Sequence, residues 1–328
     1  MISPSDTPFS PPALLRSPHL QTILSSAGPR VQLVYRAAAG VRQSARLITV
    51  PCQHGVRLHA RLNVVEGADR LIVLIHGWEG SAESLYQLSA AQRFMDAGFS
   101  VLRLNLRDHG DSHHLNEDLF HSCRLQEVID AVLWAQQEFQ PQRLFLGGFS
   151  LGGNFALRVA AKAPAAGIDL ACVLAVCPVL DPEETMHALD GGLSLYQWFF
   201  LRKWRRSLLR KMAVFPERYV FDDLHRFKTL EAMTEFFVVN HTEYPDLHSY
   251  LKGYSLEGDR LAGLSVPSDV LLAEDDPVIP VIGLERVARS DALRVQVTQF
   301  GGHCGHLKNY SLGSWADDWL LTKAMARL

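Results

Sequence analysis

The sequence has few cysteines, and those it has are scattered. The five are Cys52, Cys123, Cys172, Cys177 and Cys304, and no Cys-x-x-Cys pair occurs. This pattern argues against a dense disulfide framework and offers no metal-binding spacing. Cys172 and Cys177 lie in an apolar run that predicts a buried strand. We therefore expect a reduced, cytoplasmic protein without a bound metal.

The sequence also lacks an excess of charge of one sign and a long apolar segment. Its 32 Lys and Arg residues against 35 Asp and Glu residues give a net charge of -3, which argues against a dedicated nucleic-acid-binding protein. No apolar run is long enough to predict a spanning helix, and the first residues do not have the pattern of a secretory signal. With 48% hydrophobic residues among 328, the chain can bury a large core.

From residue 46 onward, short β-branched runs alternate with helical patterns. This order predicts an α/β fold with a mostly parallel central sheet and helices on both faces. Residues 1–45 form an N-terminal extension, and 181–258, which are rich in aromatic residues, are predicted as a helical cap inserted between 46–180 and 259–328. Strands are predicted at 46–50, 56–63, 71–75, 100–106, 144–149, 170–177, 270–273 and 295–300, and helices at 84–97, 125–139, 151–163 and 314–326.

One pentapeptide carries the strongest chemical signal. Gly148-Phe149-Ser150-Leu151-Gly152 fits the pattern G-x-S-x-G. A predicted strand precedes it and a predicted helix follows it, which is the context that a nucleophile elbow requires. The serine of such an elbow stands at a tight turn, where larger side chains two residues away would clash. We therefore predict Ser150 as a catalytic nucleophile.

A serine hydroxyl is a weak nucleophile and needs a base that an acid orients. In this fold the acid precedes the base along the chain, and both follow strands. Asp276 comes after a late strand, and His303 comes after the last strand and two glycines. Asp276 is preferred to Asp275, which we expect to cap the turn. His303 is preferred to His306, which we expect at a helix start or at the surface.

Acyl transfer also needs N–H donors for the developing oxyanion. One should be the backbone N–H of Leu151, the residue after the nucleophile, and the other that of Trp78, in the glycine-containing loop after strand 71–75. We expect His76 to be a structural hydrogen-bonding residue and Cys304 to be a small side chain that faces the core. These features predict a serine hydrolase that needs no cofactor.

These residues together resemble the α/β-hydrolase superfamily, and their combination resembles its YheT-like branch. The resemblance spans most of the chain outside the cap. It implies an α/β-hydrolase fold, the hydrolysis of carboxylic esters with short- to medium-chain or lipid-like acyl groups, and a triad of Ser150, Asp276 and His303. We expect the polar turn 107–110 to support the oxyanion loop. The matching segments are 17–22, 76–81, 105–112, 148–154, 275–277 and 301–305.

Residues 193–212 contain six basic residues, several large apolar residues and no acidic residue. Such a stretch is typical of a cap helix whose apolar face packs on the sheet while its basic face is solvated. It also suits contact with an anionic membrane surface. The expected partner is a small-molecule or lipid acyl ester, and peripheral membrane contact is a hypothesis.

Three alternatives to ester hydrolysis stay open. An acyltransferase or a thioesterase would use the same triad. The spacing His-x-x-x-x-Asp of some acyltransferases occurs twice, from His113 to Asp118 and from His241 to Asp246, and chance explains about that many matches. A non-catalytic lipid-binding protein could also keep this fold.

Overall fold

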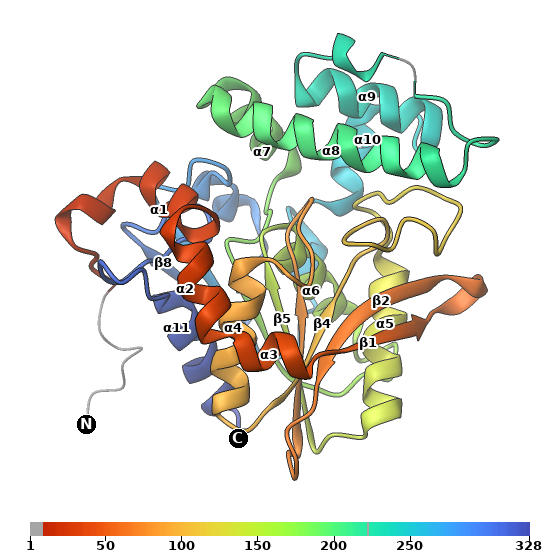
Figure 1. Ribbon diagram of the computed structural model, residues 1–328. Coiled ribbons are helices and arrows are strands. Elements are labelled where there is room, and N and C mark those ends of the chain that lie inside the picture. The colour runs from red at the N-terminus through yellow and green to blue at the C-terminus, as the bar shows by residue number, and fades with distance from the viewer. Residues whose placement is uncertain (1–8, 222) are drawn as a thin grey trace.

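The computed structural model describes residues 9–221 and 223–328 and contains one central sheet (Figure 1). The strand order is β1-β2-β4-β3-β5-β6-β7-β8. β2 is antiparallel to both of its neighbours, and the other pairs are parallel, which confirms the predicted α/β class. The strands are β1 Arg46–Pro51, β2 Arg57–Asn63, β3 Arg70–Ile75, β4 Ser100–Leu104, β5 Arg143–Phe149, β6 Leu170–Val176, β7 Ser268–Ala273 and β8 Leu293–Thr298.

Helices cover both faces of the sheet. α4 (Leu85–Asp96) and α11 (Trp315–Met325) lie on one face, and α5 (Leu125–Phe139) and α6 (Leu151–Lys162) lie on the other (Figure 1). The central strands β3, β5 and β6 are almost entirely apolar and buried, because a sheet covered on both faces has no solvated side. Three helices for which the sequence analysis predicted no element pack along α4: α1 Pro18–Ser26, α2 Pro29–Ala37 and α3 Ala39–Ser44.

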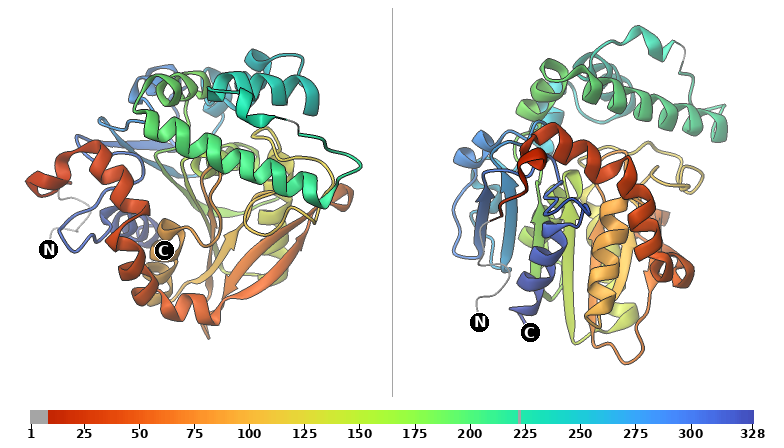
Figure 2. Two further views of the ribbon diagram at one scale, coloured as in Figure 1. Left: turned by 45° about the horizontal axis from the view of Figure 1, so that its top comes forward. Right: turned by 60° about the vertical axis from the view of Figure 1, so that its left-hand side comes forward.

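A helical cap lies over the carboxyl ends of the parallel strands (Figures 1 and 2). Its side chains Trp204, Leu208 and Phe237 belong to the same hydrophobic cluster as α5 and α6, so the cap shares a core with the sheet. No helix in the described part of the chain is long and apolar enough to cross a membrane. The cap helices are α7 Pro182–Gly191, α8 Ser194–Val214, α9 Leu230–His241 and α10 Leu247–Tyr254.

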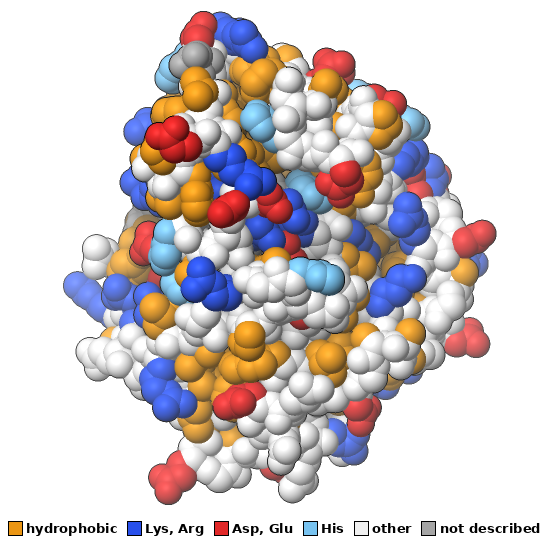
Figure 3. Space-filling view, turned by 90° about the vertical axis from the view of Figure 1, so that its right-hand side faces the viewer, with side chains coloured by type: hydrophobic (Ala, Val, Ile, Leu, Met, Phe, Trp, Pro, Cys, Tyr) orange, Lys and Arg blue, Asp and Glu red, His pale blue; other side chains and the backbone are white. Residues whose placement is uncertain are grey.

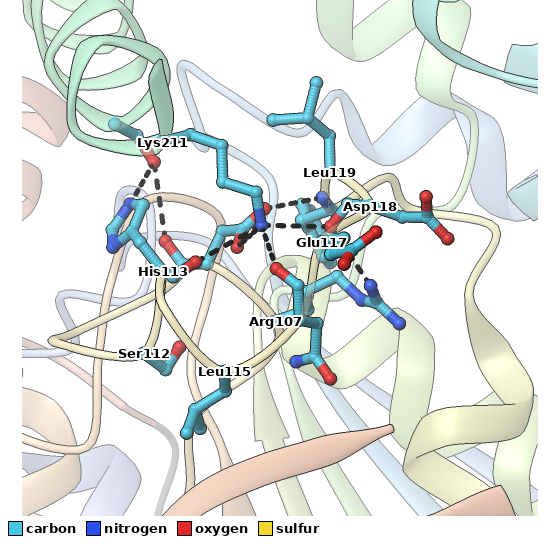
Figure 4. A network of polar contacts seen from close by, with 12 residues as sticks. Arg107, Ser112, His113, Leu115, Glu117, Asp118, Leu119 and Lys211 are labelled. Carbon is cyan, nitrogen blue, oxygen red and sulfur yellow. Dashed lines mark hydrogen bonds and ion pairs between the residues drawn. The ribbon is translucent and has the colours of Figure 1, made fainter. Parts of the chain in front are cut away.

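One buried lysine ties the cap to the loop that follows β4 (Figure 4). Lys211, near the end of α8, is fully buried. Its Nζ donates to Asp108 Oδ1 at 2.7 Å and to the carbonyl oxygens of Asn116 at 2.6 Å and Asp118 at 3.1 Å. The prediction that the basic residues of this helix are solvated is therefore wrong for Lys211. An ammonium group can be buried here because its three protons all find oxygen partners.

Replacing Lys211 by Met should destabilise the protein by about 3–5 kcal/mol, because the Asp108 carboxylate would stay buried without its cation. Urea unfolding measures the loss. The double variant Lys211→Met/Asp108→Asn is the matched control, and it should recover part of the lost free energy of unfolding because neither charge is then buried. Equal losses in the single and double variants would contradict this account of the contact.

Candidate active site

Ser150 stands at a strained turn between β5 and α6. Its backbone has φ 53° and ψ −122°, a conformation that costs a non-glycine residue free energy. The turn leaves no room for side chains at the two flanking glycines. A Cβ added to Gly148 would lie 2.1 Å from the carbonyl oxygen of Gly152, and one added to Gly152 would lie 2.3 Å from that of Ile75. The glycines therefore allow the turn that presents the Ser150 hydroxyl.

The structure brings the three predicted triad side chains into one chain of contacts. His303 Nε2 lies 3.0 Å from Ser150 Oγ, and His303 Nδ1 lies 2.9 Å from Asp276 Oδ2. The other carboxylate oxygen of Asp276 accepts the N–H groups of Val278 at 2.8 Å and Ile279 at 2.9 Å. The Asp276 carboxylate is therefore fixed on both oxygens, and its side chain is 1% exposed.

These contacts define the chemistry of the imidazole. The Asp276 carboxylate can only accept a hydrogen bond, so Nδ1 carries the proton that it donates, and in the neutral ring the lone pair is on Nε2, which faces Ser150. Burial lowers the pKa of His303, but the Asp276 carboxylate and the neighbouring Cys304 raise the pKa more, to well above its usual value. Asp276 thus favours the imidazolium form, the form that arises when Ser150 gives up its proton.

Leu151 and Trp78 both lie near Ser150: Leu151 is the next residue, and Trp78 follows Gly77, whose added Cβ would be 3.1 Å from Ser150 Cβ. Leu151 is the first residue of α6, where N–H groups have no acceptor within the helix. Trp78 lies in the loop after β3, and its N–H makes no hydrogen bond with other described residues. Both residues line cavities that reach Ser150. These are the two donors that the sequence analysis proposed for an oxyanion.

Two histidines hold the Trp78 loop in place. His109 Nε2 accepts the N–H of Glu79 at 3.1 Å, and His76 Nε2 accepts the N–H of Leu106 at 3.1 Å. Both imidazoles are buried. Burial lowers the pKa of His109 to about 4, so this ring stays neutral and can accept a hydrogen bond at neutral pH. His76 and the turn that contains His109 therefore have structural roles, as expected.

The N-terminal helix α1 holds the loop that carries His303, a contact that the sequence analysis missed. Thr22 Oγ1 accepts the His303 N–H at 2.9 Å. Gln21 Oε1 accepts the N–H of Leu307 at 2.6 Å, and Gln21 Nε2 donates to the Leu307 carbonyl at 3.2 Å. The available signal was segment 17–22, which contributed to the family resemblance without being assigned a role.

The expectations about His306 and Asp275 are corrected, and that about Cys304 is extended. His306 is not at the surface or at a helix start: it is fully buried in a cluster with the rings of Phe9 and Trp315. Cys304 packs against the core, as expected, but it is only partly buried, and its Sγ also lies 4.0 Å from His303 Nε2. Asp275 accepts the N–H of Gly302 at 2.8 Å, so it braces the His303 loop. Each of these contacts depends on a loop conformation that the local sequence does not encode.

Two cavities meet at Ser150. The larger is a groove of about 680 Å³ between the cap, the N-terminal helices and the Trp78 loop. The smaller is a pocket of about 100 Å³ under the cap, lined mostly by apolar side chains. On the face seen in Figure 3, basic and acidic side chains gather in the hollow below the cap. The pocket lining includes Trp78, Phe120, Leu151, Met186, Leu189, Phe200, Trp204, Phe237 and Ile279.

The chain belongs to the α/β-hydrolase fold family, whose model matches residues 70–310. It is 25% identical over 273 residues to the "Putative esterase YheT" of Escherichia coli strain K12, a match that covers 78% of each chain. It is also 25% identical over 218 residues to the "Monoacylglycerol lipase ABHD2" of Danio rerio, where the match covers 61% of this chain and 51% of the relative. The chain is thus a member of the α/β-hydrolase fold family that is similar to YheT over most of its length.

Solved structures show the same fold. A structure of the esterase Pf2001 of Pyrococcus furiosus matches with a TM-score of 0.54 and 13% identity, covering 86% of this chain and 88% of that one. The proline iminopeptidase of Mycobacterium smegmatis matches with a TM-score of 0.53 and 18% identity, covering 86% of this chain and 97% of that one. An esterase and a peptidase thus share the architecture, so the fold leaves the substrate open.

The buried His306 yields a prediction about stability and pH. Burial lowers its pKa from the usual 6.5 to about 4, so between these values the unfolded chain binds a proton that the native protein does not. The contribution of the neutral, buried His306 to the free energy of unfolding is therefore lost as the pH falls below 6.5. The stability advantage of the wild type over His306→Asn should shrink from pH 7.5 to 4.5, by up to about 1.4 kcal/mol per pH unit below 6.5. Urea unfolding at several pH values measures it, and a pH-independent difference would contradict the assignment.

Proposed function

We propose that the protein is a serine hydrolase that cleaves carboxylic esters with short- to medium-chain or lipid-like acyl groups. The proposal rests on two hydrogen-bond contacts of His303. Its Nδ1 lies 2.9 Å from Asp276 Oδ2, and its Nε2 lies 3.0 Å from Ser150 Oγ. These distances are those of a nucleophile within reach of its base and a base within reach of its orienting acid. The resemblance to two relatives named as an esterase and a lipase supports the same reaction class.

The proposed reaction has two steps. His303 Nε2 takes the proton of Ser150 as Oγ attacks the ester carbonyl, and the N–H groups of Trp78 and Leu151 hold the oxyanion. Asp276 orients the imidazole and stabilises its cation. His303 then protonates the leaving alcohol, and a water molecule, activated by His303, hydrolyses the acyl-enzyme. Each step uses groups of this chain, and none needs a cofactor.

The two cavities suggest how an ester would lie. The small pocket has an apolar lining and begins at Ser150 and Leu151, so it suits an acyl chain. The groove is larger and more polar and is lined by Lys203, Arg206 and Arg210, so it suits the alcohol part of the ester. A long acyl chain would exceed the small pocket, which is why we favour short to medium chains.

Replacing Ser150 by Ala should lower the hydrolysis of p-nitrophenyl esters by at least about 10³-fold, because the variant lacks the hydroxyl that attacks the ester. A series of p-nitrophenyl esters from C2 to C16, with phospholipids alongside, should give the highest kcat/KM at short to medium length in the wild type. Circular dichroism and thermal unfolding show whether the variant is folded. Undiminished activity in a folded Ser150→Ala protein would show that the nucleophile is wrongly assigned.

Acyl transfer to an acceptor other than water is the second candidate reaction. In the structure, His113 Nε2 lies 2.9 Å from Ser207 Oγ, and the Asp118 carboxylate forms an ion pair with Arg218. These contacts link the loop to the cap and do not favour an acyltransferase motif at 113–118. Product analysis with added alcohols and thioesters separates hydrolysis from transfer and from thioesterase activity.

We also propose peripheral membrane contact through the first half of α8. Trp198 is 53% exposed there, and Leu195 and Phe199 are 43% and 42% exposed. Exposed apolar residues beside cations are typical of surfaces that bind the interface of an anionic bilayer. Not all six basic residues of segment 193–212 are free to contact lipid headgroups. Lys203, Arg205 and Lys211 donate hydrogen bonds within the protein.

Vesicles that contain anionic lipid should therefore co-sediment with the protein more than neutral phosphatidylcholine vesicles do. The variant Trp198→Ser/Phe199→Ser should reduce this binding several-fold, because it removes the two exposed aromatic side chains of this part of α8. The control is Arg143→Ser, which should bind like the wild type. Arg143 is at the start of β5 and thus at the end of the parallel strands that faces away from the cap. Equal binding to neutral and anionic vesicles would exclude the proposed contact.

A further inference from the structure

Two cysteines and the candidate catalytic histidine converge beside Ser150. One nitrogen or sulfur atom from each of Cys177, His303 and Cys304 lies within 4.8 Å of the other two. Cys304 Sγ is 4.0 Å from His303 Nε2, and the N–H of Cys304 donates to Cys177 Sγ at 3.4 Å. Cys177 follows β6 and Cys304 follows β8, so the group forms only when the sheet is assembled.

Two thiols and an imidazole are a donor set that Zn²⁺ prefers. With bonds of about 2.3 Å to sulfur and about 2.0 Å to nitrogen, the ligand atoms on one tetrahedral ion lie about 3.8 Å apart for two sulfurs and about 3.5 Å apart for sulfur and nitrogen. Cys304 Sγ and His303 Nε2, now 4.0 Å apart, would have to approach by about 0.5 Å. The other pairs, all within 4.8 Å, would have to approach by about 1.3 Å at most. Three protein ligands would leave a fourth position for water or for Ser150 Oγ.

The surroundings also suit a bound metal. The Nδ1 of His303 faces the Asp276 carboxylate at 2.9 Å, which reproduces the carboxylate–histidine–metal arrangement that orients zinc-binding imidazoles and increases their basicity. His303 and Cys304 line the groove, so an ion can reach them from solvent. Cys177 is fully buried behind them. The site therefore has an entry path, an oriented imidazole and a closed inner wall.

We propose that Cys177, His303 and Cys304 form an inhibitory Zn²⁺ site. A metal on His303 Nε2 occupies the lone pair that faces Ser150 at 3.0 Å, so the imidazole can no longer take the serine proton. Binding releases the thiol protons and involves no redox change. The loss of activity rests on the proposed serine-hydrolase mechanism, whereas the binding of the metal does not.

Two measurements on the purified full chain test the site. The first is Zn²⁺ binding, followed by competition with a chromogenic chelator, and the second is hydrolysis of a short p-nitrophenyl ester at the same Zn²⁺ concentrations. We expect one equivalent of Zn²⁺ to bind at micromolar or lower concentration, with activity falling in parallel and returning after EDTA. Absence of saturable binding at one equivalent would overturn the proposal.

Variants assign the ligands. Cys304→Ala should weaken Zn²⁺ binding at least tenfold. Its hydrolysis rate, relative to the rate of the same variant without zinc, should then be inhibited only at correspondingly higher Zn²⁺ concentrations. Cys177→Ala should act in the same direction, and Cys177→Ser is the substitute if the alanine variant does not fold. Cys123→Ala, whose thiol contacts the Tyr250 carbonyl, is the control and should bind like the wild type.

The outcomes separate the two proposals. If Cys304→Ala binds Zn²⁺ as tightly as the wild type does, the proposed site is wrong whatever the enzyme activity. If no ester is hydrolysed but one Zn²⁺ binds and the cysteine variants lose it, the metal site stands and the proposed function fails. If Zn²⁺ binds at this site while hydrolysis stays unchanged, the inhibitory role is overturned.

Discussion

Ser150 has a strained backbone conformation with a positive φ of 53°, and the packing around it depends on the turn that this conformation forms between β5 and α6. β5, which leads into it, lies between β3 and β6 in the middle of the sheet, and α6 starts at the next residue. The strain is tolerable because a buried strand and a packed helix hold both ends of the turn. One consequence is the close approach of Gly148 and Gly152 to neighbouring backbone. The other is a serine hydroxyl that projects toward His303 and two cavities.

The residues that hold this site come from the whole length of the chain. Thr22, in α1, accepts the N–H of His303, which is 281 positions later. The Trp78 ring stacks on Phe200 of the cap, with centroids 5.4 Å apart. Lys211 joins the cap to the loop whose His109 braces the Trp78 loop. The cap and the N-terminal helices are therefore parts of one supporting shell, and a change in either would alter the site's geometry.

The sequence predicted the elements with strong local patterns. The strands of the core and the helices α4, α5, α6 and α11 lie within a few residues of their predicted bounds. The choice of Ser150, Asp276 and His303 followed from one motif and from the chain order of this fold, and these side chains do contact one another. By contrast, the helices α1 to α3 were not predicted. The burial of Lys211 and His306 and the approach of the Cys304 thiol to His303 were also missed, because contacts between distant elements leave no periodic signal in the sequence around each residue.

The central claim is that Ser150 is a nucleophile activated by His303, and covalent labelling tests it most directly. The purified protein is treated with a fluorophosphonate and digested, and the modified residue is located by mass spectrometry. The account predicts one equivalent of label on Ser150 in the wild type and strongly slowed labelling in His303→Ala, because the serine then lacks its base. A folded wild-type protein that takes up no label, or that carries the label on another residue, would contradict it.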